Sequence, residues 1–343
     1  MQFVGARPIG ALGLAWVIGL AGAGTLSAQE ILEFPVPTPQ SAPAGIAAGP
    51  DGNLWFAESA GNKIARITMA GVLTEYPIPT PGSHPSLLGE GPDGALWFTE
   101  TIGNKIGRIT TDGVISEFPV PTPKSGPYGI VAGSDGNLWF TEPEAAKIGR
   151  ITTAGEITEF SIPSSQAGPY VIAAGPDGNL WFTDTDGNAI GRITTDGSIT
   201  EFPIPTPDSG PIGVAAGPDG NVWFTEFNDV KGSRVGRITT AGVIAEFLVP
   251  TRDSGPRGIT AGSDGNLWFT EFRADRIAQI TISGEVTETS VPTPNSEPIR
   301  IAVGPDGNIW FTEFAASANR IGVLVRGPTL VRDREKSRTV SFR

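Results

Sequence analysis

The sequence predicts an all-β protein, a seven-bladed β-propeller of four-stranded antiparallel blades, and three observations lead to this fold class. Glycine and proline account for 46 and 31 of the 343 residues, a density that long helices cannot accommodate. An Asp-Gly pair recurs at intervals of 42 residues, once 45, and a Trp follows four residues after each Asp. The seven pairs begin at Asp51, Asp93, Asp135, Asp177, Asp219, Asp264 and Asp306. Repeats of this length are typical of propeller blades, so seven repeats predict seven blades.

Within each repeat, turn signals separate four short runs of strand-forming residues. In the third repeat these runs cover residues 129–132, 138–141, 148–152 and 157–160. Between the first two lies Gly-Ser-Asp-Gly-Asn, which favours a hairpin because Gly and Asn tolerate positive φ. The chain's eight Trp and seventeen Phe supply a large core, so its Gly and Pro content indicates turns rather than disorder. Helical bundles and doubly wound α/β folds are excluded.

The two ends of the repeat array predict how the ring closes. The fourth-strand motif begins at Ile31, before the first Trp repeat, whereas the last repeat ends at 321–325 without such a motif. We therefore expect the N-terminal strand to complete the seventh blade, because this pairs two sheet edges that would otherwise be exposed. The alternative, an open solenoid, leaves both edges unexplained.

Residues 1–28 have the pattern of a cleaved signal peptide. One cation, Arg7, precedes an uncharged stretch that ends in small residues at 25–28. A membrane anchor is the alternative, but no basic stop-transfer flank follows. We expect a secreted or periplasmic chain without an integral membrane segment, with the propeller over 29–325 and a basic tail over 326–343. This tail either docks on an acidic surface or has no role.

Charge and residue usage exclude several functions. The formal net charge of −12 repels phosphate backbones, so nucleic acid is not an expected partner. The absence of Cys excludes thiol catalysis, disulfides and Cys-ligated metals, and the single His, His84, excludes a poly-His metal site. No feature argues for an oligomer, so we expect a monomer.

Strand order predicts which face carries function. The link from each fourth strand to the next first strand and the link from second to third strand emerge on one face, and the Asp-Gly turns emerge on the other. The turns recur in every blade, so we interpret them as structural. On the first face, the residue after the Pro that begins each inner strand varies between blades, as a binding site requires. These residues are Ala44, Ser86, Tyr128, Tyr170, Ile212, Arg257 and Ile299.

Two titratable residues precede these prolines, His84 and Glu297. An imidazole titrates near neutral pH, so His84 is a candidate general acid or base. A simply solvated surface histidine is the plainer interpretation.

A second ring consists of a carboxylate three residues after each Trp. Its members are Glu58, Glu100, Glu142, Asp184, Glu226, Glu271 and Glu313. Repeats one to five also carry an Arg on the next strand, which predicts inter-strand salt bridges with these carboxylates. The last two repeats have Gln279 and Val323 there instead. Glu271 and Glu313 are therefore candidates for holding a cation or acting as a base.

The repeat signature resembles the streptogramin B lyases, the virginiamycin B lyase family. The residues that carry the resemblance are Gly-Pro-Asp-Gly-Asn-Val-Trp-Phe-Thr-Glu at 217–226, Val-Gly-Arg-Ile-Thr at 235–239 and Ile-Ala-Glu-Phe at 244–247. It covers nearly all of residues 30–325. It implies a seven-bladed propeller and a magnesium-dependent elimination that opens the ester of a cyclic depsipeptide antibiotic without water.

The resemblance also implies which residues would act. Glu297 and Glu313 match acidic positions of the family, whereas its two histidine positions are Arg257 and Ile299 here. Elimination needs a base poised near neutral pH, but isoleucine cannot accept a proton and arginine is permanently charged. Glu297, Glu313 and His84 are therefore the candidate catalytic residues for any turnover. Magnesium, if used, would be held by Glu313 and Glu271.

Two functions of different classes follow. The leading hypothesis is a propeller that binds a small or peptidic ligand on the variable face. Tyr128 and Tyr170 would give flat apolar contact, Arg257 would hold an anionic group, and Ile299 and Ser86 would line the site. The alternative is a magnesium-dependent carbon–oxygen lyase acting on streptogramin B-type depsipeptides with a different base. A pure interaction scaffold would use all blades equally.

Overall fold

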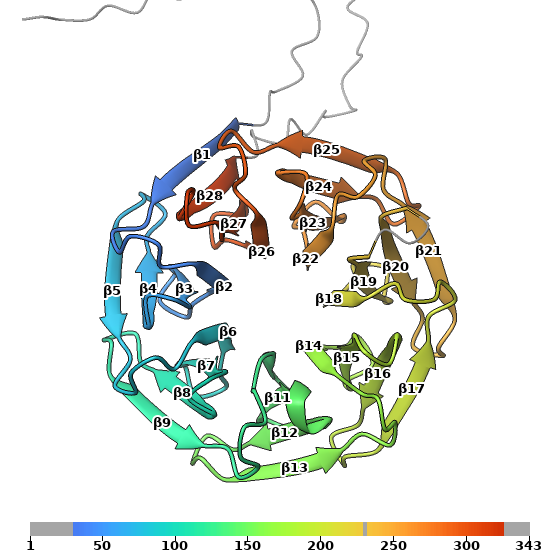
Figure 1. Ribbon diagram of the computed structural model, residues 1–343, viewed down its shortest axis with the longest axis horizontal. Coiled ribbons are helices and arrows are strands. Elements are labelled where there is room, and N and C mark those ends of the chain that lie inside the picture. The colour runs from blue at the N-terminus through green and yellow to red at the C-terminus, as the bar shows by residue number, and fades with distance from the viewer. Residues whose placement is uncertain (1–29, 229–231, 326–343) are drawn as a thin grey trace, which may run out of the picture.

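The computed structural model describes residues 30–228 and 232–325, and it confirms the all-β, seven-bladed propeller (Figure 1). The expected signal peptide, residues 1–28, and the expected basic tail, residues 326–343, lie outside the described residues. Within the described ranges, no helix is long and apolar enough to cross a bilayer.

Each blade is a four-stranded antiparallel sheet. In the first six blades the strands lie in chain order from the axis outwards, and in the seventh the N-terminal strand takes the outermost place. The first two blades comprise β2 (Pro43–Ala48), β3 (Leu54–Glu58), β4 (Lys63–Ile67) and β5 (Leu73–Pro77), then β6 (Pro85–Glu90), β7 (Leu96–Glu100), β8 (Lys105–Ile109) and β9 (Ile115–Pro119). The third and fourth comprise β10 (Ile130–Ala132), β11 (Leu138–Glu142), the 3-10 helix η1 (Pro143–Ala145), β12 (Lys147–Ile151) and β13 (Ile157–Ser161), then β14 (Pro169–Ala174), β15 (Leu180–Asp184), β16 (Ala189–Ile193) and β17 (Ile199–Pro203). The fifth and sixth comprise β18 (Pro211–Ala216), β19 (Val222–Glu226), β20 (Arg234–Ile238) and β21 (Ile244–Leu248), then β22 (Pro256–Ala261), β23 (Leu267–Glu271), β24 (Arg276–Ile280) and β25 (Val286–Ser290). The seventh comprises β26 (Pro298–Val303), β27 (Ile309–Glu313), β28 (Arg320–Val325) and β1 (Glu30–Pro35).

The core lies between neighbouring blades. In the second strand of each blade, successive side chains point to opposite faces, so Trp55 faces one neighbour while Phe56 faces the other. Phe56 packs in one cluster with Trp310 of the seventh blade, and Trp55 packs in another with Phe98 of the second blade. All seven repeat tryptophans are at most 1% exposed. No blade could bury both faces alone, so the ring is the structure that completes the core.

The Asp-Gly turns are structural, as the repetition indicated. In the third blade, the Asp135 carboxylate accepts hydrogen bonds from Trp139 Nε1 at 3.1 Å and from Asn137 Nδ2 at 2.8 Å. Gly136 takes the positive φ, 75°, that the turn needs. The aspartate thus satisfies the indole donor of a buried tryptophan, which explains why the pair recurs in every blade.

We expect Asp135→Ala to lower the free energy of unfolding by about 2 kcal/mol, because it leaves the Trp139 indole donor unsatisfied. Asp135→Asn keeps an acceptor at the same place and is the matched control, with a loss of less than about 1 kcal/mol. Urea unfolding followed by tryptophan fluorescence measures both. Equal losses would show that the turn does not depend on this hydrogen bond.

The N-terminal strand closes the ring, as predicted from the offset motif. β1 pairs antiparallel with β28, with Leu32 opposite Val323 and Phe34 opposite Ile321. Figure 1 shows β1 as the outermost strand beside β28. The Glu33 carboxylate pairs with Arg320 at 3.0 Å, and the Phe34 ring stacks on Trp310. These contacts repeat those of Glu75 and Tyr76 in the first blade.

The predicted salt bridges between the carboxylate ring and the arginines are wrong, and the strand register gives the reason. Arg66 lies directly opposite Trp55, whereas Glu58 lies opposite Lys63 at the other end of the strand pair. The Arg66 guanidinium stacks 5.6 Å from the Trp55 ring and reaches Asp51 at 3.5 Å. The equivalent arginines of blades two to five also stack on their tryptophans; they are Arg108, Arg150, Arg192 and Arg237.

Candidate functional site

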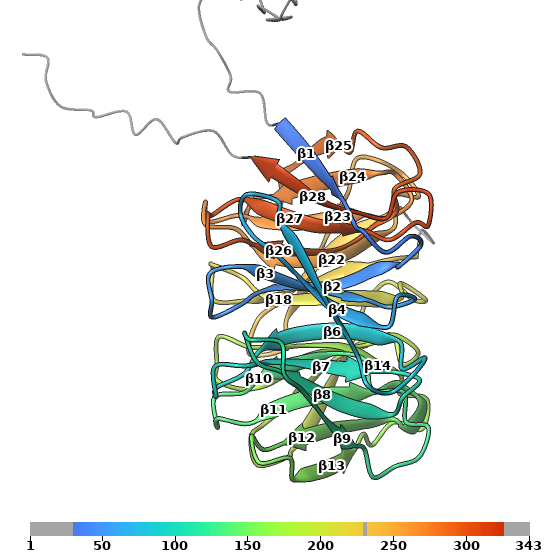
Figure 2. The same cartoon turned by 90° about the vertical axis from the view of Figure 1, so that its left-hand side faces the viewer.

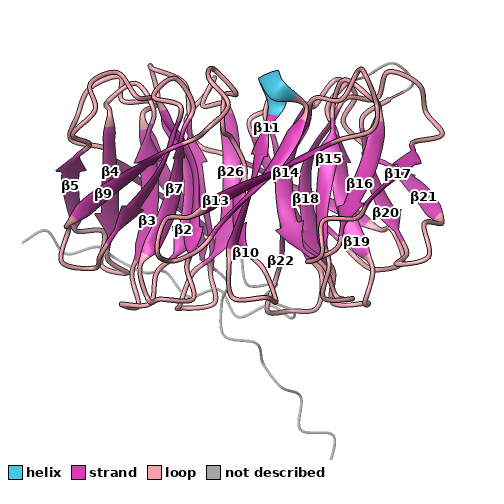
Figure 3. Cartoon of the chain, turned by 90° about the horizontal axis from the view of Figure 1, so that it is seen from below, coloured by secondary structure: helices cyan, strands magenta, loops and turns pink. Residues whose placement is uncertain are grey.

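The two sets of links predicted to share a face do so. Asn62, between β3 and β4, accepts a hydrogen bond from the Ser83 amide at 2.7 Å and donates to the Thr80 carbonyl at 3.0 Å. Thr80 and Ser83 belong to the link between β5 and β6, so the two links touch. Figure 2 shows the ring edge-on, with loops on its two faces, and in Figure 3 the short helix η1, in cyan, marks this face. We call it the variable face.

The residues before the inner-strand prolines mostly have a left-handed backbone. His84 has a φ of 52° and Glu297 a φ of 51°, and glycine occupies this position at Gly126, Gly210 and Gly255. Glycine adopts such a conformation without steric cost, which explains why it is frequent there. The His84 side chain is exposed, and that of Glu297 is half-buried.

Tyrosine and arginine side chains gather where the inner strands begin. The rings of Tyr128 and Tyr170 stack at a centroid separation of 4.0 Å. Arg300 Nη2 donates to the Tyr128 hydroxyl at 3.1 Å, and Arg257 Nη2 lies 3.5 Å from the Tyr170 hydroxyl. These four residues come from blades three, four, six and seven, so side chains from across the ring converge.

Two phenylalanines extend this cluster on the side of blades five and six. The Arg257 guanidinium lies 4.9 Å from the Phe272 ring and 5.6 Å from the Phe227 ring. Arg273 stacks on the same Phe227 ring at 4.1 Å, but it is paired with Asp253. When a guanidinium stacks on an aromatic ring, its flat face is covered and its N–H groups remain free to donate hydrogen bonds at its edge. We call Tyr128, Tyr170, Phe227, Arg257, Phe272 and Arg300 the arginine–aromatic cluster.

The positive charge of this cluster is not compensated by a carboxylate. Within the described residues, no Asp or Glu oxygen lies within 4.0 Å of the Arg257 or Arg300 nitrogens. The Nε atoms of both arginines are buried without a hydrogen-bond partner. Burial alone would raise the pKa of Tyr128, but the charges of Arg300 and Arg257 lower it below its ordinary value. Burial raises the pKa of Tyr170 to about 12.

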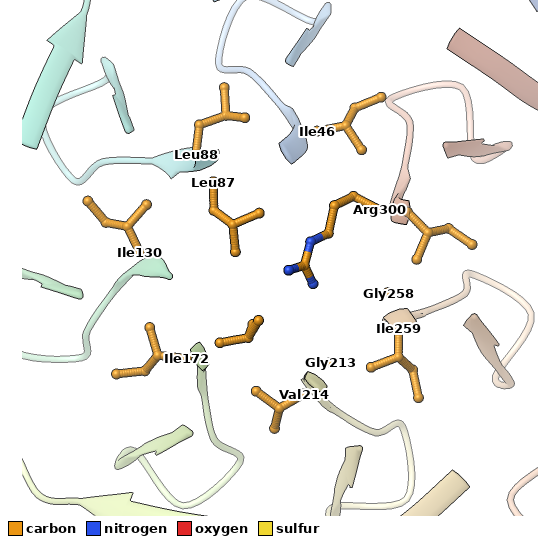
Figure 4. A pocket seen from close by; sticks show the side chains of 12 residues that line it. Ile46, Leu87, Leu88, Ile130, Ile172, Gly213, Val214, Gly258, Ile259 and Arg300 are labelled. Carbon is orange, nitrogen blue, oxygen red and sulfur yellow. The ribbon is translucent and has the colours of Figure 1, made fainter. Parts of the chain in front are cut away.

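A cavity of about 150 Å³ lies on the axis of the ring. Most of the side chains that line it are aliphatic, and Figure 4 shows Arg300 extending from β26 into the space between them. The lining side chains include Ile46, Leu87, Leu88, Ile130, Val171, Ile172, Val214, Ile259 and Ile301. We call this space the axial channel.

The structure places the other two predicted ligand-binding residues in packed surroundings. Ile299 is 3% exposed. Ser86 is 7% exposed, and its hydroxyl is 2.7 Å from the Thr101 hydroxyl. Their side chains therefore support the inner strands on either side of the cluster.

The second ring of carboxylates is buried in every blade. Glu271 and Glu313 are fully buried at the ends of β23 and β27, and their oxygens accept no well-formed hydrogen bond. Burial, followed by the negative charge of Glu288, raises the pKa of Glu271 to about 8. Burial and the charge of Glu33 do the same for Glu313. The same environment recurs at Glu58, Glu100, Glu142 and Glu226.

The register brings two of the three predicted catalytic residues to one end of the seventh blade. Pro298 lies opposite Glu313, so the neighbouring Glu297 is close to this carboxylate along the backbone. His84 belongs to the second blade, two blades further around the ring. The described residues contain no cluster of three His, Asp or Glu side chains suited to a metal. Glu271 and Glu313 are fully buried in two different blades, surroundings that do not fit a magnesium ion, which usually keeps several of its waters.

The sequence contained signals for the cluster residues that its analysis missed. A phenylalanine follows the second-strand carboxylate in blades five to seven, whereas blades one to four have Ser59, Thr101, Pro143 and Thr185. Arg300 occupies a position where four other blades have glycine, at Gly45, Gly129, Gly213 and Gly258. The phenylalanines lie one residue after the ring of carboxylates, and Arg300 lies one residue after the variable position at the start of its inner strand.

The fold and this face define a class, a closed seven-bladed propeller whose variable face carries arginine and aromatic side chains over an axial channel. Within that class, the chain belongs to the virginiamycin B lyase family, whose family model matches residues 29–321.

Solved structures of lyases resemble the chain over most of its length. A virginiamycin B lyase from Staphylococcus aureus is 42% identical, with a TM-score of 0.82, over 87% of this chain and 99% of that one. A catalytically inactive histidine-to-alanine variant of virginiamycin B lyase from the same species, with quinupristin, is 41% identical over the same shares, with the same TM-score. A streptogramin B lyase is 39% identical, again with a TM-score of 0.82, over 87% of this chain and 97% of that one.

Proposed function

We propose that this chain is a ligand-binding member of its family, which holds a small or peptidic ligand on the variable face without opening it. The observation that carries the proposal is the uncompensated charge of Arg257 and Arg300 within the arginine–aromatic cluster. The buried Nε donors of both arginines lack partners, which favours a ligand rich in hydrogen-bond acceptors. The signal-peptide pattern of residues 1–28 suggests that binding takes place outside the cytoplasm.

The same residues argue against the family's elimination. In the inactive S. aureus variant, alanine replaces one histidine. Here Arg257 and Ile299 occupy the two positions where the resemblance implies histidine. His84 is an exposed residue of the second blade, whereas Glu297 and Glu313 belong to the seventh. Without an imidazole at this place, the remaining group with a pKa raised towards this range is Glu313, and its fully buried carboxylate is not accessible to a substrate.

The cluster suggests how a ligand is held. Tyr128 and Tyr170 offer stacked rings with hydroxyls, and Phe272 and Phe227 hold Arg257 from the other side. Aromatic side chains give large contact area at low conformational cost, and arginine gives directional donors. Residues from four blades contribute, so a ligand that spans them would contact more surface than any single blade offers.

Quinupristin is the probe that tests the proposal, because it accompanies one of the similar structures. The chain is titrated with quinupristin by isothermal calorimetry and, separately, incubated with it and magnesium. Ring opening leaves the mass unchanged, so it is detected by a chromatographic shift with new fragment ions. We expect saturable binding and an intact ring, with the S. aureus lyase opening quinupristin in parallel.

Arg257→Ala is expected to weaken quinupristin binding by about tenfold, as loss of a charge-assisted contact predicts. Arg252→Ala removes an exposed arginine five residues earlier and is the matched control, with no change expected. Ring opening would overturn the proposal in favour of the lyase alternative, and Glu297→Gln would then test the acidic pair. Binding that is absent, or insensitive to Arg257, would show that the face is wrongly assigned.

A further inference from the structure

Arg300 is a buried cation that lies among mostly aliphatic side chains. Its residue is 6% exposed, and among its side-chain nitrogens Nη2 bonds to the Tyr128 hydroxyl while Nε has no partner. No described carboxylate lies within ion-pair distance. A guanidinium in such surroundings is costly unless an anion joins it, because it has lost its water without gaining a countercharge.

Four other blades have glycine at the position equivalent to Arg300, where the inner strands approach one another closely. A Cβ atom at Gly213 would lie 2.2 Å from the Arg257 carbonyl oxygen, and one at Gly258 would lie 2.8 Å from the Ile299 carbonyl oxygen. Glycine is therefore required there for the close approach of neighbouring inner strands. Leu87 and Arg300 project into the channel where glycine is absent, so one charged group faces aliphatic side chains (Figure 4).

The size of the cavity limits the occupant. An apolar cavity of about 150 Å³ in another protein accommodates benzene, and the axial channel has about the same volume. Its aliphatic lining gains free energy by covering apolar surface, at about 25 cal/mol for each Å². The arginine favours a planar anion that accepts two parallel hydrogen bonds, which is the geometry of a carboxylate.

We propose that the axial channel binds a monocarboxylate with an apolar body of about six carbons, with the carboxylate on Arg300 and the apolar body against the aliphatic wall. The proposal rests on the proposed function, since it assigns the charged part of the ligand that the variable face takes. Tyr128 holds Arg300 in position through its hydroxyl, and Arg257 stands closer to the aromatic residues at the rim.

The test compares three probes on the unmodified chain by ligand-observed NMR and calorimetry. Benzoate carries both the charge and the ring, benzamide keeps the ring without the charge, and acetate keeps the charge without the ring. We expect 1:1 binding of benzoate, with benzamide and acetate each at least about tenfold weaker. Equal binding of benzoate and benzamide, or of benzoate and acetate, would overturn the proposal.

Two variants locate the site. Arg300→Met removes the charge at similar volume and is expected to weaken benzoate binding by about tenfold or more, while Arg300→Lys restores part of the affinity. Arg252→Ala, which removes an exposed arginine outside the arginine–aromatic cluster, is the control and is expected to leave benzoate affinity unchanged. Circular dichroism and melting curves verify that the variants are folded. Unchanged benzoate binding in Arg300→Met would overturn the assignment.

The outcomes separate this inference from the proposed function. If quinupristin binds in an Arg257-dependent manner but benzoate does not bind, the channel assignment is wrong and the binding face stands. If benzoate binds through Arg300 while quinupristin does not bind, the channel assignment stands and the peptidic ligand class is wrong. If neither binds, both are wrong.

Discussion

The melting temperature of the chain is expected to be highest at about pH 4 to 4.5 and to fall as the pH rises from there through 7 and 8. Burial raises the pKa of six second-strand glutamates from 4.5 to about 7 or 8. Between 4.5 and these values the folded chain keeps protons that the unfolded chain has released, so the free energy of unfolding decreases with rising pH. Differential scanning calorimetry from about pH 4 to pH 9 measures the effect.

The size of this effect follows from the number of groups. One pKa unit corresponds to about 1.4 kcal/mol, so six carboxyl groups shifted by a single unit lower the free energy of unfolding by about 8 kcal/mol. That is comparable to the whole stability of a typical domain, roughly 5–15 kcal/mol. Relaxation and water penetration reduce the shift in each blade, and the melting temperature is expected to fall by more than about 10 °C between pH 5 and pH 9.

An opposite slope is expected on the acid side. Partial burial alone would raise the pKa of Asp51, but hydrogen bonds from Asn53 and Trp55 lower it below its ordinary value. The pKa values of the aspartates in four other turns are lowered in the same way. A carboxyl group with a lowered pKa contributes stability above its unfolded value, near 4, and this stability is lost as the pH falls further. The two slopes together place the maximum between them.

A pair of identical substitutions in one blade separates the two kinds of carboxylate. Glu142→Gln replaces a buried group of raised pKa and is expected to raise the melting temperature at about pH 8.5 but not at about pH 5. Glu159→Gln removes a carboxylate that pairs with Lys147 at 2.8 Å and is expected to lower it at about pH 8.5. A melting temperature that stays level or rises between pH 5 and 9 would contradict the assignment.

The number and spacing of the repeats predicted the ring, because the fold consists of one blade repeated seven times and each blade contains the same Asp-Gly turn. Asp135 and Trp139 are four residues apart in sequence and meet within one hairpin, so sequence spacing was sufficient. The closure of the ring could also be predicted, because the fourth-strand motif at Ile31 precedes the first repeat and so must complete another blade. These features depend on contacts that recur, and recurrence is visible in a single sequence.

The site depends on contacts that occur once. Arg300 reaches Tyr128 across the axis, 172 residues away, and no repeat contains that pair. The error over Arg66 and Glu58 has a related cause, because residue spacing alone does not reveal which residues the register places opposite each other. Once Arg66 is opposite Trp55, it stacks on the indole, and Glu58 is left buried at the other end of the strands.

A disulfide across the closing strands is expected to stabilise the ring more than the same bridge elsewhere. The chain has no Cys, and Leu32 lies directly opposite Val323, so Leu32→Cys with Val323→Cys forms a single defined bridge. It closes nearly the whole propeller into one loop, and in the chain-entropy account such a loop contributes about 5 kcal/mol. Melting curves of the oxidised and reduced forms measure the gain without the cost of the substitutions themselves.

The matched bridge lies at the equivalent register of the first blade, where Arg66 is opposite Thr74. Arg66→Cys with Thr74→Cys joins strands that are already neighbours in sequence, so the same account gives about 2 to 3 kcal/mol. A larger gain for the closing bridge is what the difference in loop length predicts, because the longer loop removes more freedom from the unfolded chain. Equal gains would contradict this account. If no bridge formed between positions 32 and 323 under oxidising conditions, β1 would not be the strand that completes the seventh blade.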